Sequence, residues 1–219
     1  MTDMVLACCI GSHLLGDFYL QSDTMAEAKL HSTRMVMVHS LLYAIPFVPL
    51  LFCSPFLFAT LVLSHLCIDL FRLGGRGRAF FVVDQLLHLA FLFVATASVS
   101  VSLPPQVLAY GNQIVIAVYL LAIGKPVSVM FVRLFSALRP ENLPGSTGGA
   151  GKTIGYLERL LLACLLLAGQ GGAIGWVIAA KAFARSSQLS SSPAFCEYFL
   201  IGTLFSILSV VALYTVMFS

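Results

Sequence analysis

The chain has 219 residues, of which 59% are hydrophobic and only 10% are charged, and its mean hydropathy is +0.98. An ordinary soluble domain carries about 25% charged residues, so this composition excludes a soluble globular protein. The formal net charge of +3 is too small for a nucleic-acid-binding protein, so we expect membrane lipid and no nucleic acid as its partner. Apolar runs recur from the first residues to the last, which predicts one transmembrane domain over residues 1–219.

The apolar runs, read between polar, proline and glycine residues, predict about seven membrane-spanning helices. They are expected at residues 4–22, 34–53, 56–72, 79–101, 106–138, 154–180 and 196–218. The ten-residue alternation of an outer-membrane barrel is not found, so the predicted fold class is an all-α polytopic transmembrane helical bundle. Residues 1–101 form a four-helix half that contains all the histidines, and residues 106–219 form a three-helix supporting half.

The fifth expected span is too long for a single straight crossing and contains Gly124, Lys125 and Pro126. Proline removes a backbone donor from a helix, and a lysine is costly in hydrocarbon. We therefore expect a kink or a break at this position.

Lysine and arginine in short loops favour the cytoplasmic side of a membrane, so their distribution predicts the orientation. One set of loops carries Lys29, Arg34, Arg72, Arg76, Arg78, Arg133, Arg139 and Lys152, and the opposite set carries Lys181 and Arg185. With seven spans, this bias predicts an external N-terminus and a cytoplasmic C-terminus.

Several ionisable residues lie inside the predicted spans, in pairs four positions apart. The pairs are His13 with Asp17, His65 with Asp69, and Asp84 with His88. Four residues make one helical turn plus about 40°, so both members of a pair point the same way. At 1.5 Å of rise per residue, the pairs lie about 4 to 15 Å inside the cytoplasmic ends of their helices. His39 lies at about 7 Å, so the second helix contributes to the same layer.

This layer predicts a divalent metal site in the bundle, because inward-facing imidazole and carboxylate groups build such sites. The candidate metal ligands are His13, Asp17, His39, His65, Asp69, Asp84 and His88. Nitrogen and carboxylate donors suit zinc best, with manganese or iron as alternatives, and the cysteines lack the spacing of a thiolate site. So many donors indicate either a dinuclear centre or aspartates that only orient the imidazoles. The alternative is a set of hydrogen bonds that fixes helix packing.

Other polar residues surround the layer. Gln21 continues the face of His13 and Asp17, Tyr43 follows His39 by one turn, and Gln85 adjoins Asp84. Arg72, near the membrane surface, could hold a phosphate group, or it could only set the topology and attract anionic lipid. His31 is expected to be a solvated loop residue.

These motifs resemble a bacterial integral-membrane family known as domain of unknown function 3307. The first half of the chain carries the resemblance in His13-Leu-Leu-Gly-Asp17-Phe-Tyr-Leu-Gln21, His39-Ser-Leu-Leu-Tyr43, His65-Leu-Cys-Ile-Asp69 and Asp84-Gln85-Leu-Leu-His88. The second half carries it in Ile154-Gly-Tyr-Leu-Glu158-Arg159, Ala173-Ile-Gly-Trp-Val-Ile-Ala-Ala-Lys181, Arg185 and Glu197-Tyr-Phe-Leu-Ile-Gly-Thr203. Ser186 departs from the family pattern, which often has an aromatic residue there. The resemblance implies a multi-pass protein of the bacterial inner (cytoplasmic) membrane.

Three functions fit these observations. The first is a metal-dependent membrane hydrolase acting on a lipid or lipid-linked phosphate, with Asp17 or Asp84 as the base and Arg72 on the phosphate. The second is a proton- or metal-ion-coupled transporter. The third is a non-catalytic membrane protein with a structural metal. A similarity in style to inner-membrane metal-dependent hydrolases, which also carry histidine and aspartate in apolar helices, favours the first by analogy.

Overall fold

The computed structural model describes residues 4–71, 77–140 and 150–218, and every regular element within these ranges is a helix. This confirms the all-α fold class. In this part of the chain, four helices are long and apolar enough to cross a membrane, namely Thr33–Cys53, Arg78–Ser98, Gly111–Leu138 and Pro193–Phe218. Shorter apolar helices are found at Met4–Tyr19, Pro55–Phe71 and Gly171–Ala184.

The chain divides into two compact units, Met1–Leu121 and Ala122–Ser219. The division falls inside the fifth apolar run and not at the 102–105 link, where we expected the two halves to meet. The reason is that α8 (Gly111–Ile123) packs against the first helix. Gly11 lets Val118 come close, since a Cβ there would lie 2.9 Å from a Val118 methyl carbon. The Tyr19 hydroxyl donates to the Leu121 carbonyl at 2.8 Å.

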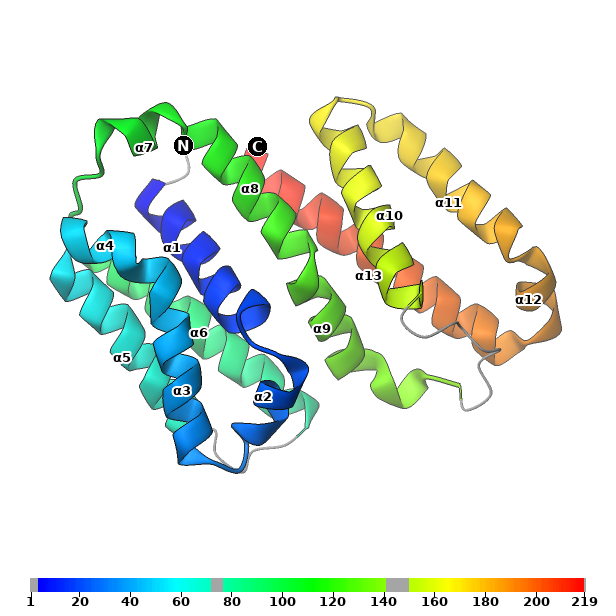
Figure 1. Cartoon of the computed structure of the whole chain (residues 1–219). Helices are drawn as coiled ribbons and strands as arrows, with labels where there is room; N and C mark the ends of the chain where they lie inside the picture. The colour runs from blue at the N-terminus through cyan, green and yellow to red at the C-terminus, as the bar shows by residue number, and fades with distance from the viewer. Residues whose placement is uncertain (1–3, 72–76, 141–149, 219) are drawn as a thin grey trace. The chain divides into compact units, whose positions relative to one another are not determined.

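The first unit is a group of antiparallel helices joined by short connections (Figure 1). Its elements are α1 (Met4–Leu14), the π-helix η1 (Leu15–Tyr19), α2 (Asp23–Ala28), α3 (Thr33–Ala44), η2 (Ile45–Phe47), α4 (Val48–Cys53), α5 (Pro55–Phe71), α6 (Arg78–Ser98), α7 (Pro105–Ala109) and α8. Local capping fixes where two of these begin. The hydroxyl of Ser22 accepts the Met25 N–H, and that of Ser32 accepts the Met35 N–H.

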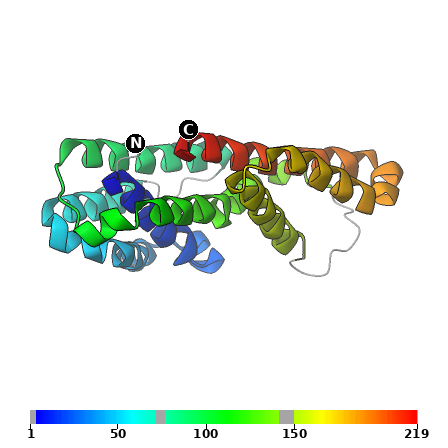
Figure 2. The ribbon, with the colours of Figure 1, turned by 90° about the horizontal axis from the view of Figure 1, so that it is seen from above.

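Helices α3, α5 and α6 lie side by side, and α1 packs on α6 and η2 (Figures 1 and 2). The apolar core of this unit lies towards one end of the helices and comprises Val5, Cys9, Tyr43, Phe47, Leu57, Leu61, Leu92 and Ala95. These residues come from the first parts of α1 and α5, the last parts of α3 and α6, and η2. The other end of the four helices is consequently left for the polar residues.

The first helix changes from α to π geometry in its last turn. The Leu20 N–H donates to the Leu15 carbonyl five residues back, at 2.9 Å. A π-turn adds a residue to the turn and redirects the side chains that follow, and such turns are frequent at functional sites. It therefore alters the four-residue spacing that relates His13 to Asp17.

The predicted break in the fifth span is confirmed. Helix α8 ends at Ile123, and α9 (Lys125–Phe135) begins directly after Gly124, with Pro126 in its first turn. Such a break leaves backbone carbonyls without helical partners, which is costly in an apolar environment. In the second unit, the buried Arg159 guanidinium offsets this cost by donating to the carbonyls of Ile123 (2.6 Å) and Gly124 (3.3 Å).

The predicted single span at 154–180 is wrong. The structure has two helices there, α10 (Ala150–Leu167) and α11 (Ile174–Ala184), which run in opposite directions (Figure 1). Helix α10 ends in a Schellman motif with Gly169 at φ +71°, where the Gly169 and Gln170 N–H groups donate to the carbonyls of Leu166 and Leu165. The residues on both sides of this turn are apolar, so hydropathy alone predicts one continuous span and does not reveal the reversal.

The remaining elements of the second unit are η3 (Ser136–Leu138), η4 (Gly171–Ala173), α12 (Ser186–Ser191) and α13 (Pro193–Phe218). An ion pair of 2.6 Å between Glu158 of α10 and Lys181 of α11 ties the reversed helices together. Helix α13 packs on α10 and α9. The first residues of α13 and of α10 lie at the same end of the second unit (Figure 1).

Candidate metal centre

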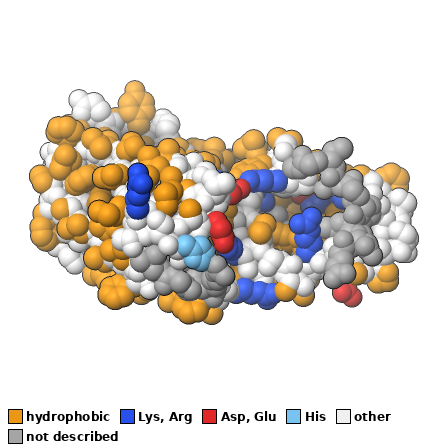
Figure 3. All heavy atoms as spheres, turned by 60° about the horizontal axis from the view of Figure 1, so that its bottom comes forward, with side chains coloured by type: hydrophobic (Ala, Val, Ile, Leu, Met, Phe, Trp, Pro, Cys, Tyr) orange, Lys and Arg blue, Asp and Glu red, His pale blue; other side chains and the backbone are white. Residues whose placement is uncertain are grey.

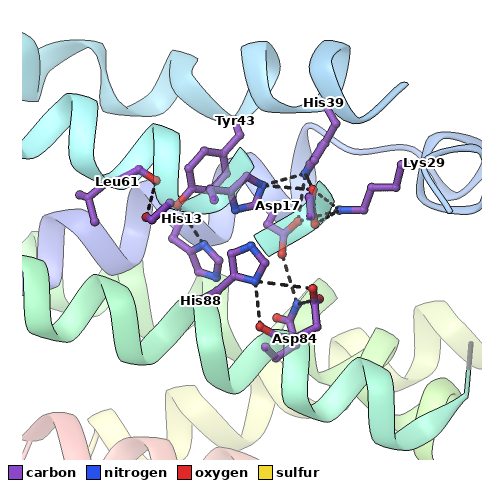
Figure 4. Close-up of polar contacts among 12 residues, drawn as sticks. His13, Asp17, Lys29, His39, Tyr43, Leu61, Asp84 and His88 are labelled. Carbon is purple, nitrogen blue, oxygen red and sulfur yellow. Dashed lines mark hydrogen bonds and ion pairs between the residues drawn. The ribbon is translucent and has the colours of Figure 1, made fainter. Parts of the chain in front are cut away.

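Helices α1, α3, α5 and α6 bring their ionisable residues together in the interior of the first unit (Figure 4). No residue of this group has more than 5% of its surface exposed. The group consists of His13, Asp17, Lys29, His39, Tyr43, His65, Asp69, Asp84 and His88. All seven candidate ligands expected from the sequence are thus buried in one place, together with a lysine that was not expected there.

Four atoms of this group converge closely, and we call their residues, Asp17, His39, His65 and Asp69, the four-donor set. The Nε2 atoms of His39 and His65 are 3.1 Å apart. The Oδ1 atom of Asp17 lies 3.2 Å from His39 Nε2. The Oδ2 atom of Asp69 lies 3.6 Å from both imidazole nitrogens.

Four of the six separations among these donors fit a single tetrahedral metal ion, and the donor atoms of Asp17, His39 and His65 all lie within 4.8 Å of one another. Ligand bonds of 2.0–2.1 Å around tetrahedral zinc place neighbouring donor atoms about 3.4 Å apart. The measured separations of 3.1 to 3.6 Å bracket that value. The chemistry of the donors also fits, because two imidazoles and two carboxylates suit zinc, manganese or iron.

A second possible group shares His65 and Asp69 with the four-donor set. One donor atom from each of His65, Asp69 and His88 lies within 4.8 Å of the others. The Nε2 atom of His88 is buried and has no hydrogen-bond partner among the described residues. The geometry of these three residues would therefore allow a second ion to bind beside the first.

Lys29 is the residue that the sequence analysis missed. Its ammonium donates to both carboxylate oxygens of Asp69, at 3.2 and 2.9 Å, and lies 3.6 Å from Asp17. The sequence places Lys29 among the basic loop residues that predict the orientation. The layer contains three aspartates and no lysine or arginine, which is the one signal of a buried counter-ion, but this signal does not indicate which basic residue supplies it.

His13 lies beside the four-donor set and is oriented by Tyr43. Its Nδ1 atom is 3.2 Å from the Tyr43 hydroxyl, and the Tyr43 ring stacks on the His65 ring at 3.6 Å with an interplanar angle of 2°. The Oδ1 atom of Asp17 contacts His39, and the π-turn that contains Asp17 begins two residues after His13.

Asp84 and His88 form a separate pair next to the four-donor set. The His88 Nδ1 atom lies 2.8 Å from the Asp84 backbone carbonyl and 3.8 Å from its carboxylate. The Gln85 amide donates to Asp84 (3.1 Å) and to Asp17 (3.4 Å), and so connects the pair to the set. The His88 and His65 rings are 4.4 Å apart.

The other polar residues expected around the cluster differ in how far they are exposed. Gln21 is half-buried, and His31 is exposed, in agreement with its expected place in a loop. Arg72, expected to hold a phosphate, lies outside the described residues. Arg34 and Arg78 are exposed at the beginnings of α3 and α6, on the end of the unit nearest the cluster. Charged and histidine side chains are visible on this face of the molecule (Figure 3).

Residues 5–118 match the family described as protein of unknown function DUF3307. The match covers more than half of the chain. This chain belongs to the DUF3307 family. No curated protein and no solved structure matches it. The match contains every residue of the buried cluster, so the part of the chain that defines the DUF3307 family also builds the candidate metal centre.

Gly16 controls how closely η1 approaches α3. A Cβ at Gly16 would lie 2.8 Å from a ring carbon of Tyr43 and 3.0 Å from its backbone Cα and O. We expect Gly16→Ala to push α3 away from Asp17 and lower the free energy of unfolding by about 1–3 kcal/mol. Thermal unfolding of the detergent-solubilised protein measures this. The control is Gly175→Ala, which has open space within 4 Å and gains helix propensity. Equal melting temperatures for the two variants would contradict the prediction.

Proposed function

We propose that this protein is a metal-dependent hydrolase of the bacterial cytoplasmic membrane, acting on a lipid or lipid-linked phosphate. The observation that carries the proposal is the four-donor set, in which His39 Nε2 lies 3.1 to 3.6 Å from one donor atom each of Asp17, His65 and Asp69. Ionisable groups inside a membrane are expensive and are functional candidates by default. Zinc is the preferred ion, with manganese or iron as alternatives.

The neighbouring Asp84–His88 pair supplies the chemistry that the four-donor set lacks. A divalent ion, when bound, activates water and polarises a phosphate oxygen. Asp17 belongs to the four-donor set, which leaves Asp84 as the stronger candidate for the general base. The Gln85 amide holds Asp84 against the set, and His88 Nδ1, which donates to the Asp84 backbone carbonyl, keeps the imidazole beside that carboxylate.

The position of the cluster favours a substrate with an anionic headgroup. The four helices place the cluster towards the end that also carries Arg34 and Arg78. Arginine binds phosphate through paired hydrogen bonds, and basic residues at a membrane surface attract anionic lipids. Arg72 is proposed for the same role.

A second candidate function is transport of a metal ion or of protons. The observation that favours it is that all the donors are 5% exposed or less, with a lysine ammonium among them. Buried carboxylates and histidines form ion and proton pathways in membrane proteins. A non-catalytic protein with a structural metal is the third outcome that the experiments below distinguish.

We propose that the end of the first unit bearing Lys29, Arg34 and Arg78 faces the cytoplasm, by the positive-inside rule. In the second unit, Lys152 lies in the first turn of α10, and the reversal after α10 returns Lys181 and Arg185 towards the end where α10 begins. Because two helices take the place of the expected sixth span, we propose that α13 crosses the membrane in the other direction and that the C-terminus faces outwards, in place of the cytoplasmic C-terminus expected from seven spans.

The orientation is tested with epitope tags in intact cells. A tag after Ser219 should be accessible from outside, whereas a tag inserted after Pro140 should become accessible only when the cells are permeabilised. The reason is that two short antiparallel helices replace one span, which changes the parity of the crossings. A protected tag at Ser219 would refute the outward C-terminus.

Metal content tests the centre itself. We expect the purified protein to hold one or two divalent ions, and His39→Ala and His65→Ala to weaken zinc binding by more than about 100-fold, beyond the 10–100-fold typical of an orienting residue. His31→Ala is the matched control, because His31 is exposed. Metal analysis and zinc titration provide the measurement. Stoichiometric zinc in the His39/His65 double variant would exclude the centre.

Asp84→Asn separates catalysis from transport and structure. The variant keeps the size of the side chain but removes the charge that a base needs. We expect it to fold and retain zinc, and to lower turnover of a lipid-phosphate substrate by about 100-fold or more. Loss of zinc-dependent flux in liposomes, without an effect on hydrolysis, would support transport. Loss of zinc and of stability together would mark a structural centre.

A further inference from the structure

Lys29 is bound by the same oxygen atoms that belong to the four-donor set. Its Nζ atom lies 2.9 Å from Asp69 Oδ2, the atom that also faces both imidazoles. It lies 3.6 Å from Asp17 Oδ1, which is the atom that faces His39. One ammonium group thus contacts both carboxylates from which a metal centre would take its oxygen ligands.

An ammonium group at this position and a divalent ion compete for the same oxygens. An ion bound to Asp69 Oδ2 lies about 2.0–2.2 Å from that oxygen. With Lys29 Nζ at 2.9 Å from the same oxygen, the two cations could be separated by about 5 Å at most. Repulsion between like charges this close is strong in a buried site, where water screens it little.

We propose that Lys29 is a tethered counter-ion, which occupies the centre in the absence of metal and withdraws when a divalent cation binds. This inference rests on the proposed metal centre and deepens it, because it names the step by which the centre is loaded. The buried carboxylates need a cation in either condition, since an unpaired charge is very costly in a protein interior. The lysine meets that need without metal, and the ion replaces it.

The segment that carries Lys29 is suited to this movement. Lys29 directly follows α2, a helix of six residues with no buried member, whose packing is against α3. A lysine side chain is long and flexible and readily extends its ammonium to a membrane surface. Asp23 and Glu27 of α2 are exposed and offer carboxylates to the withdrawn ammonium.

The first test compares zinc affinity in the full-length, detergent-solubilised protein. Lys29→Met removes the competing charge and keeps a long apolar side chain, so zinc should bind at least about tenfold more tightly than to the wild type. The matched control is Lys152→Met, at an exposed position, and its affinity should be unchanged. Zinc bound equally or more weakly by Lys29→Met, with normal binding by the wild type, would overturn the counter-ion role and leave the centre standing. No zinc binding by either protein would instead overturn the centre.

The second test uses the wild type, so it does not depend on the folding of a variant. An amine-reactive reagent and mass spectrometry report how accessible the Lys29 ammonium is, with exposed Lys152 as the internal reference. Labelling of Lys29 relative to Lys152 should be low in chelator and rise several-fold at saturating zinc. If zinc binds and this ratio stays low, Lys29 does not withdraw and the proposal fails.

Discussion

The first unit depends on the balance of charge in an interior that is otherwise apolar. Asp17 and Asp69 are both buried and both contact Lys29 and His39, and buried carboxylates are very unfavourable unless cations or hydrogen-bond donors compensate them. The structure supplies Lys29, His39 and Gln85 to these two groups. The helices are therefore held at specific distances by polar contacts as well as by packing.

The same constraint explains the details of backbone geometry around the cluster. Gly16 lets η1 come within contact distance of the α3 backbone at Tyr43, and the π-turn at Leu15–Tyr19 aims Asp17 at His39. The Tyr43 ring then packs flat against His65. A cluster in which each side chain is oriented by a neighbour is pre-organised, which is the property that a metal or catalytic site requires.

In the second unit, a buried charged side chain compensates backbone carbonyl groups at a helix break. The helix break at Gly124 interrupts the backbone hydrogen bonds in an apolar environment, and the Arg159 guanidinium donates to the carbonyls of Ile123 and Gly124 on either side of it. Glu158 pairs with Lys181, and so joins the two helices that replace the expected sixth span.

The sequence by itself determined the all-helical class, the break at Gly124 and the set of histidines and aspartates that meet in the first unit. It could do so because hydropathy, proline and the four-residue helical spacing are local properties of the chain. Only the tertiary structure decided that α10 and α11 reverse at Gly169, because a left-handed glycine cap interrupts a helix without interrupting its apolar character. Only the tertiary structure placed Lys29 on Asp69, forty residues away, because pairing across helices depends on how the helices pack and not on the residues beside the lysine.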